Sequence, residues 1–361
     1  MNEFEPPAPM QVRLCSQSEP DQHYFARYLP ELLQLEQLIS THRDKLQLES
    51  LAVPGFEGRE FPIHAVSLGS RQADAPVLAF VGGVHGVERI GTQLLLAFLN
   101  SVLLRMEWDQ GLQQELQQVR LLFCPLLNPV GMAQGTRSNG NGVDLMRNSP
   151  LNAEHAPTWM VGGHRLSCRL PWYRGREGGA MQLESQSLCD WVQRQLFASP
   201  FSLVLDCHSG FGSKDRLWFP WAGSRDPFPH CAEVAALTSL FEASYPHHNY
   251  LIEPQHHNYL THGDLWDYLY QQSINSQGRV FLPLTLELGS WLWVKKNPLQ
   301  LRSFLGLFNP MVPHRRKRAL RGHLLLLEFL IRVTRSSQRW LPTGQMRAGF
   351  EQQARKRWYG G

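Results

Sequence analysis

The stretch from Val77 to Glu88 reads Val-Leu-Ala-Phe-Val-Gly-Gly-Val-His-Gly-Val-Glu. Its first five residues are continuously apolar, which predicts a strand buried on both faces, and the two glycines end that strand. His85 and Glu88 then follow three residues apart, so an imidazole and a carboxylate can be directed at one point. This arrangement predicts half of a zinc site, which needs a third ligand and a base from elsewhere in the chain.

Two later apolar runs supply candidates for the missing groups. His208 closes the run Leu-Val-Leu-Asp-Cys-His, and Glu287 closes the run Leu-Pro-Leu-Thr-Leu-Glu. Side chains at the carboxyl ends of parallel strands gather at one edge of an α/β sheet. Any one of these residues alone would more often be a hydrogen-bonded core side chain, but three strand ends, each close to a glycine, favour one common site.

The rest of the pattern alternates strands with helices, which is typical of an α/β fold. Apolar or alternating runs predict the strands, and residues at helical spacing predict the helices. The strands are expected at 61–68, 77–81, 119–127 and 201–205, and the helices at 90–104 and 185–197. We predict a three-layer α/β/α sandwich with a mixed, largely parallel twisted sheet.

The chain divides into three predicted regions. Residues 1–50 are expected to form an N-terminal helical extension packed on the core, residues 51–335 the catalytic domain, and residues 336–361 a polar, basic, weakly ordered tail. The stretch 211–263 is rich in aromatic residues, proline and histidine and is long for a connection, so we expect it to face the substrate. Further helices are expected at 24–42, 299–307 and 315–333.

The mild overall charge gives no sign of a nucleic-acid or membrane partner, because the formal net charge is only +4. The basic clusters at 314–318 and 355–357 could contact nucleic acid or acidic lipid, but they are interpreted as solvated helix faces and a polar tail. The six cysteines show no Cys-x-x-Cys spacing, and the acidic, proline-rich start is unlike a signal peptide, so we expect a reducing, cytoplasmic location. The chain has neither a Gly-x-Ser-x-Gly elbow nor a phosphate-binding loop, which excludes the enzyme classes that depend on them.

Two histidines and a glutamate form a ligand set typical of catalytic zinc, because three protein ligands leave a fourth position for water. Zinc lowers the pKa of such a water toward about 7, and a nearby carboxylate can then carry the proton to a leaving amine. Glu287 is the candidate carboxylate, since burial between leucines raises a carboxyl pKa toward the useful range. The residues therefore predict a hydrolase with one Zn²⁺ ion.

With these residues in place, the chain resembles the zinc metallocarboxypeptidases of the carboxypeptidase A type, as an atypical member. The resemblance covers about residues 77–290 in four blocks. They are His-Gly-Val-Glu at 85–88, Asn-Pro-Val-Gly at 128–131, the stretch from Arg137 to Asn148 that contains Gly-Val-Asp-Leu-Met-Arg-Asn, and the late His208 with Glu287.

This resemblance implies roles for the residues that would bind the metal and move protons. One zinc ion would be held by His85, Glu88 and His208, and Glu287 would act as general base and acid. Asp144 would accept the second ring hydrogen of a zinc-bound histidine, taken to be His85, and so fix its tautomer.

The resemblance also implies roles for residues that would contact the substrate. Arg137 would polarise the scissile carbonyl and stabilise the oxyanion. Arg147, with the neighbouring Asn148, would bind the terminal carboxylate of the substrate. Tyr259 is the best match for a family tyrosine that closes over the substrate, although its residue pattern alone fits an ordinary packing tyrosine equally well.

Two positions depart from the family pattern. Met146 stands where the family usually has asparagine, and Val87 stands where digestive members carry an arginine. Both changes weaken recognition of a terminal carboxylate and leave the zinc chemistry intact. Hydrolysis is therefore predicted more firmly than removal of a C-terminal residue.

Three hypotheses follow, and the sequence leaves the oligomeric state open. The favoured one is a zinc metallocarboxypeptidase acting on small peptides, with peptidoglycan fragments as one substrate option. The second is an N-acyl amino acid deacylase of the aspartoacylase and succinylglutamate desuccinylase type. A smaller C-terminal β domain would favour the deacylase, and the helical pattern after Leu299 argues against it. The third, a non-enzymatic binding protein on the same fold, is disfavoured because all four site residues are present.

Overall fold

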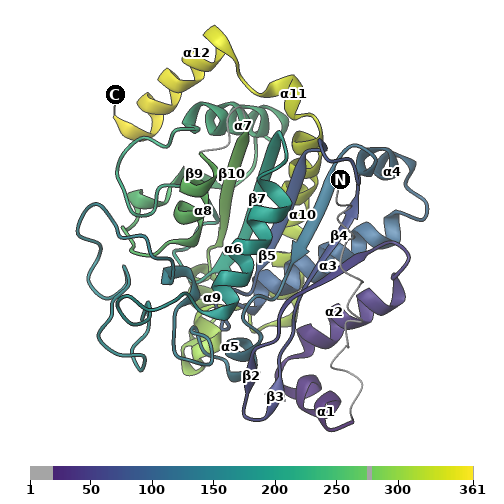
Figure 1. Cartoon of the computed structure of the whole chain (residues 1–361), viewed down its shortest axis with the longest axis vertical. Helices are drawn as coiled ribbons and strands as arrows, with labels where there is room; N and C mark the ends of the chain where they lie inside the picture. The colour runs from purple at the N-terminus through teal and green to yellow at the C-terminus, as the bar shows by residue number, and fades with distance from the viewer. Residues whose placement is uncertain (1–18, 275–278, 361) are drawn as a thin grey trace, which may run out of the picture.

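A mixed eight-stranded sheet forms the centre of the molecule (Figure 1). The computed structural model describes residues 19–274 and 279–360 of the chain. The sheet contains, in spatial order, β1 (Gln47–Ala52), β4 (Ile63–Gly69), β6 (Arg120–Cys124), β5 (Val77–Gly82), β7 (Phe201–Ser209), β10 (Val280–Leu288), β8 (Arg216–Phe219) and β9 (Leu251–Pro254). A separate hairpin joins β2 (Gly55–Phe56) to β3 (Arg59–Glu60).

The four central strands β6, β5, β7 and β10 are parallel, and antiparallel pairs join them to the strands on either side. The register places Glu287 of β10 directly beside His208 of β7, and Gly82 of β5 beside Cys207. The carboxyl ends of these three strands therefore meet at one edge of the sheet. The predicted mixed sheet with a parallel centre is confirmed.

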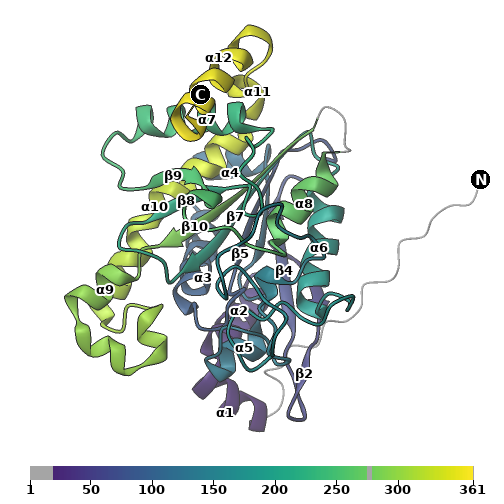
Figure 2. The ribbon, with the colours of Figure 1, turned by 90° about the vertical axis from the view of Figure 1, so that its left-hand side faces the viewer.

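Helices cover both faces of the sheet and give the predicted three layers. Figure 2 shows α3 (Arg89–Arg105) and α10 (Pro313–Arg335) on one side, with α6 (Leu183–Leu196) and α8 (Leu265–Ser273) on the other. The remaining helices are α1 (Glu19–Tyr28), α2 (Pro30–Thr41), α4 (Gln110–Leu116), α5 (Pro129–Gln134), α7 (Cys231–Ser244), α9 (Trp291–Lys296), α11 (Ser337–Trp340) and α12 (Gly344–Ala354). Short 3₁₀ turns are η2 (Leu145–Arg147), η3 (Gln255–His257), η4 (Pro298–Arg302) and η5 (Phe304–Leu307), and a π-helical turn, η6 (Arg355–Tyr359), follows α12.

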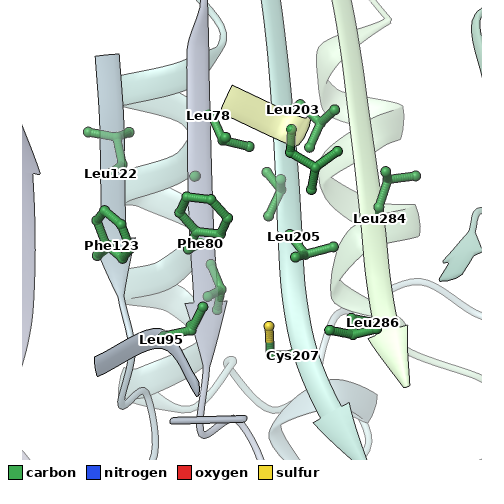
Figure 3. Packing of buried hydrophobic residues seen from close by; sticks show 14 of the residues in the cluster. Leu78, Phe80, Leu95, Leu122, Phe123, Leu203, Leu205, Cys207, Leu284 and Leu286 are labelled. Atoms are coloured by element: carbon green, nitrogen blue, oxygen red, sulfur yellow. The ribbon is translucent and has the colours of Figure 1, made fainter. Parts of the chain in front are cut away.

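The core lies between the sheet and these helices. Figure 3 shows apolar side chains of β6, β5, β7 and β10 filling this space, with Leu95 of α3 packed below Phe80. The rings of Phe80 and Phe123 stack with their centroids 4.9 Å apart. Strand β7 is buried along its whole length, as its apolar sequence requires. This rigid centre holds the strand ends that carry His208 and Glu287.

The N-terminal region differs in detail from its prediction. The single helix expected at 24–42 is two helices, because Pro30 has no amide hydrogen and occupies the first turn of α2. Phe25, Leu29 and Leu32 pack together in a small second core. Strand β1 crosses the predicted boundary at residue 50, and its backbone pairs with β4. The helical extension is thus joined directly to an edge strand of the sheet.

The predicted weakly ordered tail is wrong. From Ser337 to Tyr359 the chain forms α11, α12 and η6. Trp358 is buried and donates its indole hydrogen to the carbonyl of Ile252, while Arg347 forms an ion pair with Glu233 of α7. The polar composition of residues 337–359 did not predict this helical structure, because few apolar side chains, such as Trp358, pack the segment on the core.

The stretch 211–263 is also more regular than a loop, because it contains β8, α7 and β9.

No helix among the described residues has the length and apolarity needed to cross a membrane. The cysteines that the structure describes are all unpaired, and Cys15 lies outside the described residues. Cys207 is fully buried behind the end of β7, and burial raises the pKa of its thiol well above the ordinary value.

Candidate functional site

His85 and Glu88 lie on the short loop between β5 and α3. Glu88 is the residue immediately before α3, and its amide donates to the carbonyl of His85 at 3.0 Å. Between them, Gly86 touches the backbone of α5 so closely that a Cβ would lie 2.1 Å from the carbonyl carbon of Gly131. The absence of a side chain at Gly86 therefore lets the loop sit tightly on α5 and fixes the positions of both side chains.

His208 lies near the end of β7, with a carboxylate on either side of its ring. Its Nε2 donates to Asp206 Oδ2 at 2.7 Å, and its Nδ1 lies 3.1 Å from Glu88 Oε2. Asp206 also accepts the indole hydrogen of Trp266. Burial disfavours the charged imidazole, but Asp206 and Glu88 outweigh it and raise the pKa of His208 well above the ordinary value.

The three predicted metal ligands come together. One ligand atom each of His85, Glu88 and His208 lie within 4.8 Å of one another, and all three side chains are buried. Nδ1 of His85 has no hydrogen-bond partner among the described residues. Burial and the nearby Arg137 hold the pKa of His85 well below its ordinary value, so this imidazole is neutral.

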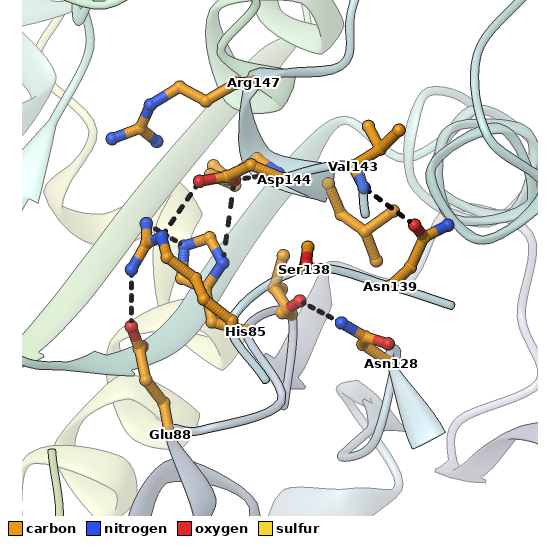
Figure 4. Close-up of polar contacts among 12 residues, drawn as sticks. His85, Glu88, Asn128, Ser138, Asn139, Val143, Asp144 and Arg147 are labelled. Carbon is orange, nitrogen blue, oxygen red and sulfur yellow. Dashed lines mark hydrogen bonds and ion pairs between the residues drawn. The ribbon is translucent and has the colours of Figure 1, made fainter. Parts of the chain in front are cut away.

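Arg137 contacts both His85 and Glu88, and Figure 4 shows Asp144 close to His85. Arg137 donates through Nε to Asp144 at 2.9 Å, through Nη1 to Glu88 at 3.1 Å, and through Nη2 to His85 Nε2 at 2.7 Å. Asp144 is fully buried, and its Oδ1 lies 3.7 Å from His85 Nδ1, which is longer than a hydrogen bond. Asp144 thus lies beside His85 as expected, and Arg137 is its closer partner.

Glu287 lies on β10 beside His208 and faces the same cluster. Its Oε1 accepts a hydrogen bond from the backbone amide of Phe211 at 2.9 Å. Burial, together with the neighbouring Glu88 carboxylate, raises the pKa of Glu287 to about 8. A carboxyl group with such a pKa can both accept and return a proton near neutral pH.

A cavity of about 340 Å³ opens above these groups. Its polar side is formed by His85, Glu88, His208, Arg137, Arg147 and Glu287, and the ring of Tyr259 also faces it. Tyr259 packs against Phe211 and Trp218, with ring centroids 5.6 and 6.0 Å away. Burial raises the pKa of Tyr259, so its hydroxyl stays protonated and can donate a hydrogen bond.

Arg147 is buried at the wall of this cavity. Its Nε donates to the carbonyl of Val161 at 3.3 Å, and its guanidinium carbon lies 5.9 Å from the centre of the Tyr259 ring. Figure 4 shows its guanidinium turned away from Asp144 and joined to none of the residues drawn. Within the part of the chain that the structure describes, no carboxylate forms an ion pair with Arg147, although Asp264 lines the same cavity.

One predicted substrate contact is wrong. Asn148 does not line the cavity, because its side-chain amide donates to the carbonyl of Arg174 and accepts from the backbone amide of Gln182. Met146, the departure beside it, does line the cavity and presents a thioether there. The side chain of Val87 is fully buried, so this position contributes apolar packing and no charge to the site.

Asp206 and most of the apolar wall were not predicted from the sequence. Asp206 precedes His208 by two residues on one strand, so both side chains point to the same face of the sheet. That spacing could have identified it. Phe304 and Phe308, by contrast, come from the turns after α9 and reach the cavity only through the tertiary fold. The paired histidines 247–248 and 256–257 do not belong to a metal-binding cluster among the described residues.

Comparisons with known proteins agree with this geometry. A family model described as zinc carboxypeptidase matches residues 35–290. The chain is 25% identical over 248 residues to carboxypeptidase SOL1 of Arabidopsis thaliana, covering 66% of this chain and 45% of that protein. It is 26% identical over 269 residues to the carboxypeptidase N catalytic chain of Rattus norvegicus, covering 66% and 56%. The chain thus spans about half the length of these relatives.

Solved structures show the same fold. Thrombin-activatable fibrinolysis inhibitor aligns with a TM-score of 0.63 and 16% identity, over 84% of this chain and 72% of that one. Carboxypeptidase A of Helicoverpa armigera aligns with a TM-score of 0.60 and 18% identity, over 84% and 71%. Because the family model spans far more than half of the 361 residues, the chain belongs to the zinc carboxypeptidase family.

Proposed function

We propose that this protein is a zinc carboxypeptidase that removes the C-terminal residue from small peptides. One observation carries the exopeptidase part of the proposal. Arg147 is a buried guanidinium at the cavity wall that forms no ion pair with a carboxylate of the described residues. A buried cation is costly unless an anion pairs with it, so the cavity is suited to a substrate that brings its own carboxylate.

The metal part of the proposal rests on the donor set. His85, Glu88 and His208 offer two imidazoles and a carboxylate within reach of one ion, and His85 Nδ1 is buried and accepts or donates no hydrogen bond among the described residues. These ligands suit zinc and leave a position open. When bound, the zinc ion supplies Lewis-acid polarisation of the scissile carbonyl and lowers the pKa of the attacking water.

Glu287 and Arg137 carry the proposed proton transfer and charge stabilisation. Glu287 takes the proton of the attacking water and delivers it to the leaving amine, which its raised pKa of about 8 favours. Arg137, held by Asp144, donates hydrogen bonds to the carbonyl oxygen as negative charge develops there. Removing one such donor typically costs about 100- to 1,000-fold in rate.

Arg147 and Tyr259 orient the substrate in this proposal. Arg147 pairs through its planar guanidinium with the terminal carboxylate, and the protonated hydroxyl of Tyr259 donates to the same end of the substrate. Met146 offers no amide hydrogen there, so carboxylate binding depends on Arg147 more than the family pattern implies. Much of the remaining wall, including Phe304 and Trp218, is apolar and suits an uncharged part of the substrate.

The two other hypotheses find less support. All described elements after β10 are helices or helical turns, so the described C-terminal part contains no β domain of the kind that would favour an N-acyl amino acid deacylase. A binding protein without activity does not require Glu287 poised with a raised pKa beside the ligand cluster. Cytoplasmic location stays a prediction from sequence.

A hydrolysis screen tests the proposal. The purified, zinc-loaded protein is offered a set of short peptides with a free terminal carboxylate, the same peptides as C-terminal amides, and N-acyl amino acids. We expect cleavage of the free acids alone, with a single amino acid released from the C-terminus. Equal cleavage of acids and amides would remove the proposed role of Arg147, and preference for N-acyl amino acids would assign the chain to the deacylases.

A further inference from the structure

The segment from Trp291 to Arg321 forms a lobe made of α9, η4, η5 and the first turns of α10, here called the 291–321 lobe. Figure 2 shows α9 and the turns after it projecting beyond the sheet at the lower left. The lobe exposes six large apolar side chains: Trp291, Leu292, Leu299, Leu301, Phe304 and Met311. Leu299 is 64% exposed and Leu301 is 60% exposed, so neither packs against the rest of the protein.

The same lobe carries a strong positive charge. Between Glu287 and Glu328 the sequence has eight Lys or Arg residues and no Asp or Glu. Lys295, Arg302 and the run 316–318 are exposed. The whole chain has a formal net charge of only +4, so the positive charge is concentrated in this one region.

We propose that the 291–321 lobe docks the protein on the surface of an anionic lipid bilayer. Exposed Trp, Leu and Phe side chains lower their free energy by entering the boundary between headgroups and acyl chains, and lysines and arginines around them are attracted to anionic headgroups. Each basic residue near such a surface strengthens binding by about fivefold. Apart from Phe304, which lines the cavity, five exposed apolar side chains and seven exposed basic side chains on the lobe supply both terms, and binding is peripheral.

Other occupants match the lobe less well. A second copy of the chain would bring the same eight positive charges to the interface, and like charges oppose that contact. The phosphates of a nucleic acid would pair with the Lys and Arg side chains of the lobe, but a nucleic acid offers no apolar interior for its leucine and methionine side chains. The lobe therefore fits a partner that is anionic at its surface and apolar just below, as a bilayer is.

The lobe is also fixed directly to the proposed active site. Asn309 donates to the carbonyl of Val87 and accepts from the amide of Ile90, which holds the lobe on the loop of His85 and Glu88. The indole of Trp291 donates to the carbonyl of Gly210, two residues after His208. Phe304 and Phe308 line the cavity itself. Docking through the lobe thus places the cavity beside the bilayer, within reach of peptides at its surface.

This proposal replaces the expectation that the chain has no membrane partner. The basic cluster at 314–318 was interpreted as a solvated helix face, because nothing in the sequence showed which apolar residues near it would be exposed. In the structure, Leu299, Leu301 and Met311 are exposed in the turns that precede the cluster.

Co-sedimentation of the full-length protein with vesicles tests the proposal. We expect binding to vesicles of phosphatidylcholine mixed with phosphatidylserine, little binding to phosphatidylcholine alone, and release at high salt. R316Q/K317Q/R318Q should lower the partition coefficient by roughly a hundredfold. L299S/L301S should lower it as well, because buried apolar area is lost.

Two matched controls separate the lobe from general charge and hydrophobicity. R43Q/R71Q/K356Q removes the same charge from exposed positions elsewhere, and L104S/L183S removes two exposed leucines elsewhere. Both should bind vesicles like the unaltered protein, and melting temperatures should show that all four variants are folded.

Equal binding by the lobe variants and the controls would overturn the proposal. So would a dimer formed without vesicles that L299S/L301S abolishes, since a second copy would then occupy the lobe. Vesicle binding is independent of peptidase activity, so failure here leaves the proposed function intact.

Discussion

At the scale of single residues, two neighbouring buried glutamates differ in their ionisation. Burial would raise the pKa of Glu88, but the neighbouring His208 and Arg137 outweigh it and lower this pKa below the ordinary value, so Glu88 stays ionised. His208 and Arg137 also lower the pKa of Glu287, but burial and the Glu88 carboxylate outweigh them and raise it to about 8. A pair of carboxyl groups pushed apart in pKa suits one for binding a cation and the other for moving protons.

Glu287→Gln should abolish hydrolysis while zinc stays bound, because glutamine keeps the shape of the side chain and cannot take a proton. A general base contributes about 100- to 10,000-fold, so kcat/KM should fall by that factor. The measurement pairs initial rates with metal analysis. Glu184→Gln is a matched control, since Glu184 is also buried and has a raised pKa but bonds to Asn139 outside the cavity. Full activity of Glu287→Gln would remove this residue from the mechanism.

The raised pKa of Glu287 also predicts a pH dependence. The carboxylate works as a base when ionised, so activity should fall as pH drops through its pKa. Burial and Glu88 move that pKa up to about 8, and a cation bound nearby opposes the shift. The acid limb of kcat/KM against pH should therefore lie between the ordinary value of 4.5 and 8. A profile that is flat over this interval would contradict the role of Glu287 as base.

Asp206→Asn should weaken zinc binding, because Asp206 orients His208 through a 2.7 Å hydrogen bond to Nε2. Loss of such a partner typically costs about 10- to 100-fold in metal affinity. Competition with a chelator measures the dissociation constant, and activity at saturating zinc should recover much of its original value. An unchanged zinc affinity would show that Asp206 serves only the fold.

Single site residues differ in how far sequence predicts them. His85, Glu88, His208 and Glu287 were predictable because each lies at or just after the carboxyl end of an apolar strand, and parallel strand ends meet at one edge. The position of the Asn148 side chain was not predictable, because its direction depends on hydrogen bonds to two distant backbone groups. Tyr259 reaches the cavity through the packing of Phe211 and Trp218, which no local pattern encodes.

At the scale of elements, the loop between β5 and α3 depends on its contact with α5. Gly86→Ala should destabilise the fold by about 1–3 kcal/mol, because its Cβ would overlap the backbone of Gly131 and neither backbone can yield easily. It should also weaken zinc binding, since His85 and Glu88 move with the loop. Urea unfolding and metal titration measure the two effects.

Gly349→Ala is the control for this substitution. Gly349 lies within α12, and a Cβ there would meet nothing within 4 Å. Alanine is the better helix former by about 1 kcal/mol, so this variant should be as stable as the unaltered protein or more so. If Gly86→Ala is equally harmless, the close approach of the loop to α5 is not what fixes the ligands.

The central strands and their helices were predictable as elements because apolar runs of five or more residues leave few alternatives. The turns η4 and η5 were expected as helix. The cavity-lining role of Phe304 and Leu307 in η5 was not predicted, since residues 298–307 carry no periodic pattern that distinguishes a packed face. Spatial strand order, in which β6 lies between β4 and β5, also follows from tertiary packing and not from local sequence.

At the scale of the whole molecule, the C-terminal segment completes the core. Trp358 packs against Phe219 with ring centroids 4.8 Å apart and bonds to the carbonyl of Ile252. Trp358→Ala should therefore cost about 3–5 kcal/mol in the free energy of unfolding. Trp159→Ala, at a position 83% exposed, should change it by only about 0.5 kcal/mol or less. Denaturant unfolding compares the two, and similar small effects would mean that the segment does not stabilise the fold.

The whole arrangement, a sheet whose parallel strand ends present two histidines and two glutamates to one cavity, has a direct test in zinc analysis. Elemental analysis of the purified protein should find about one zinc per chain, as one three-ligand site requires. His208→Ala should lose that zinc while remaining folded, and Glu287→Gln should keep it. Zinc content that is unchanged in His208→Ala, or no zinc in the unaltered protein after loading, would contradict the metal centre formed by His85, Glu88 and His208.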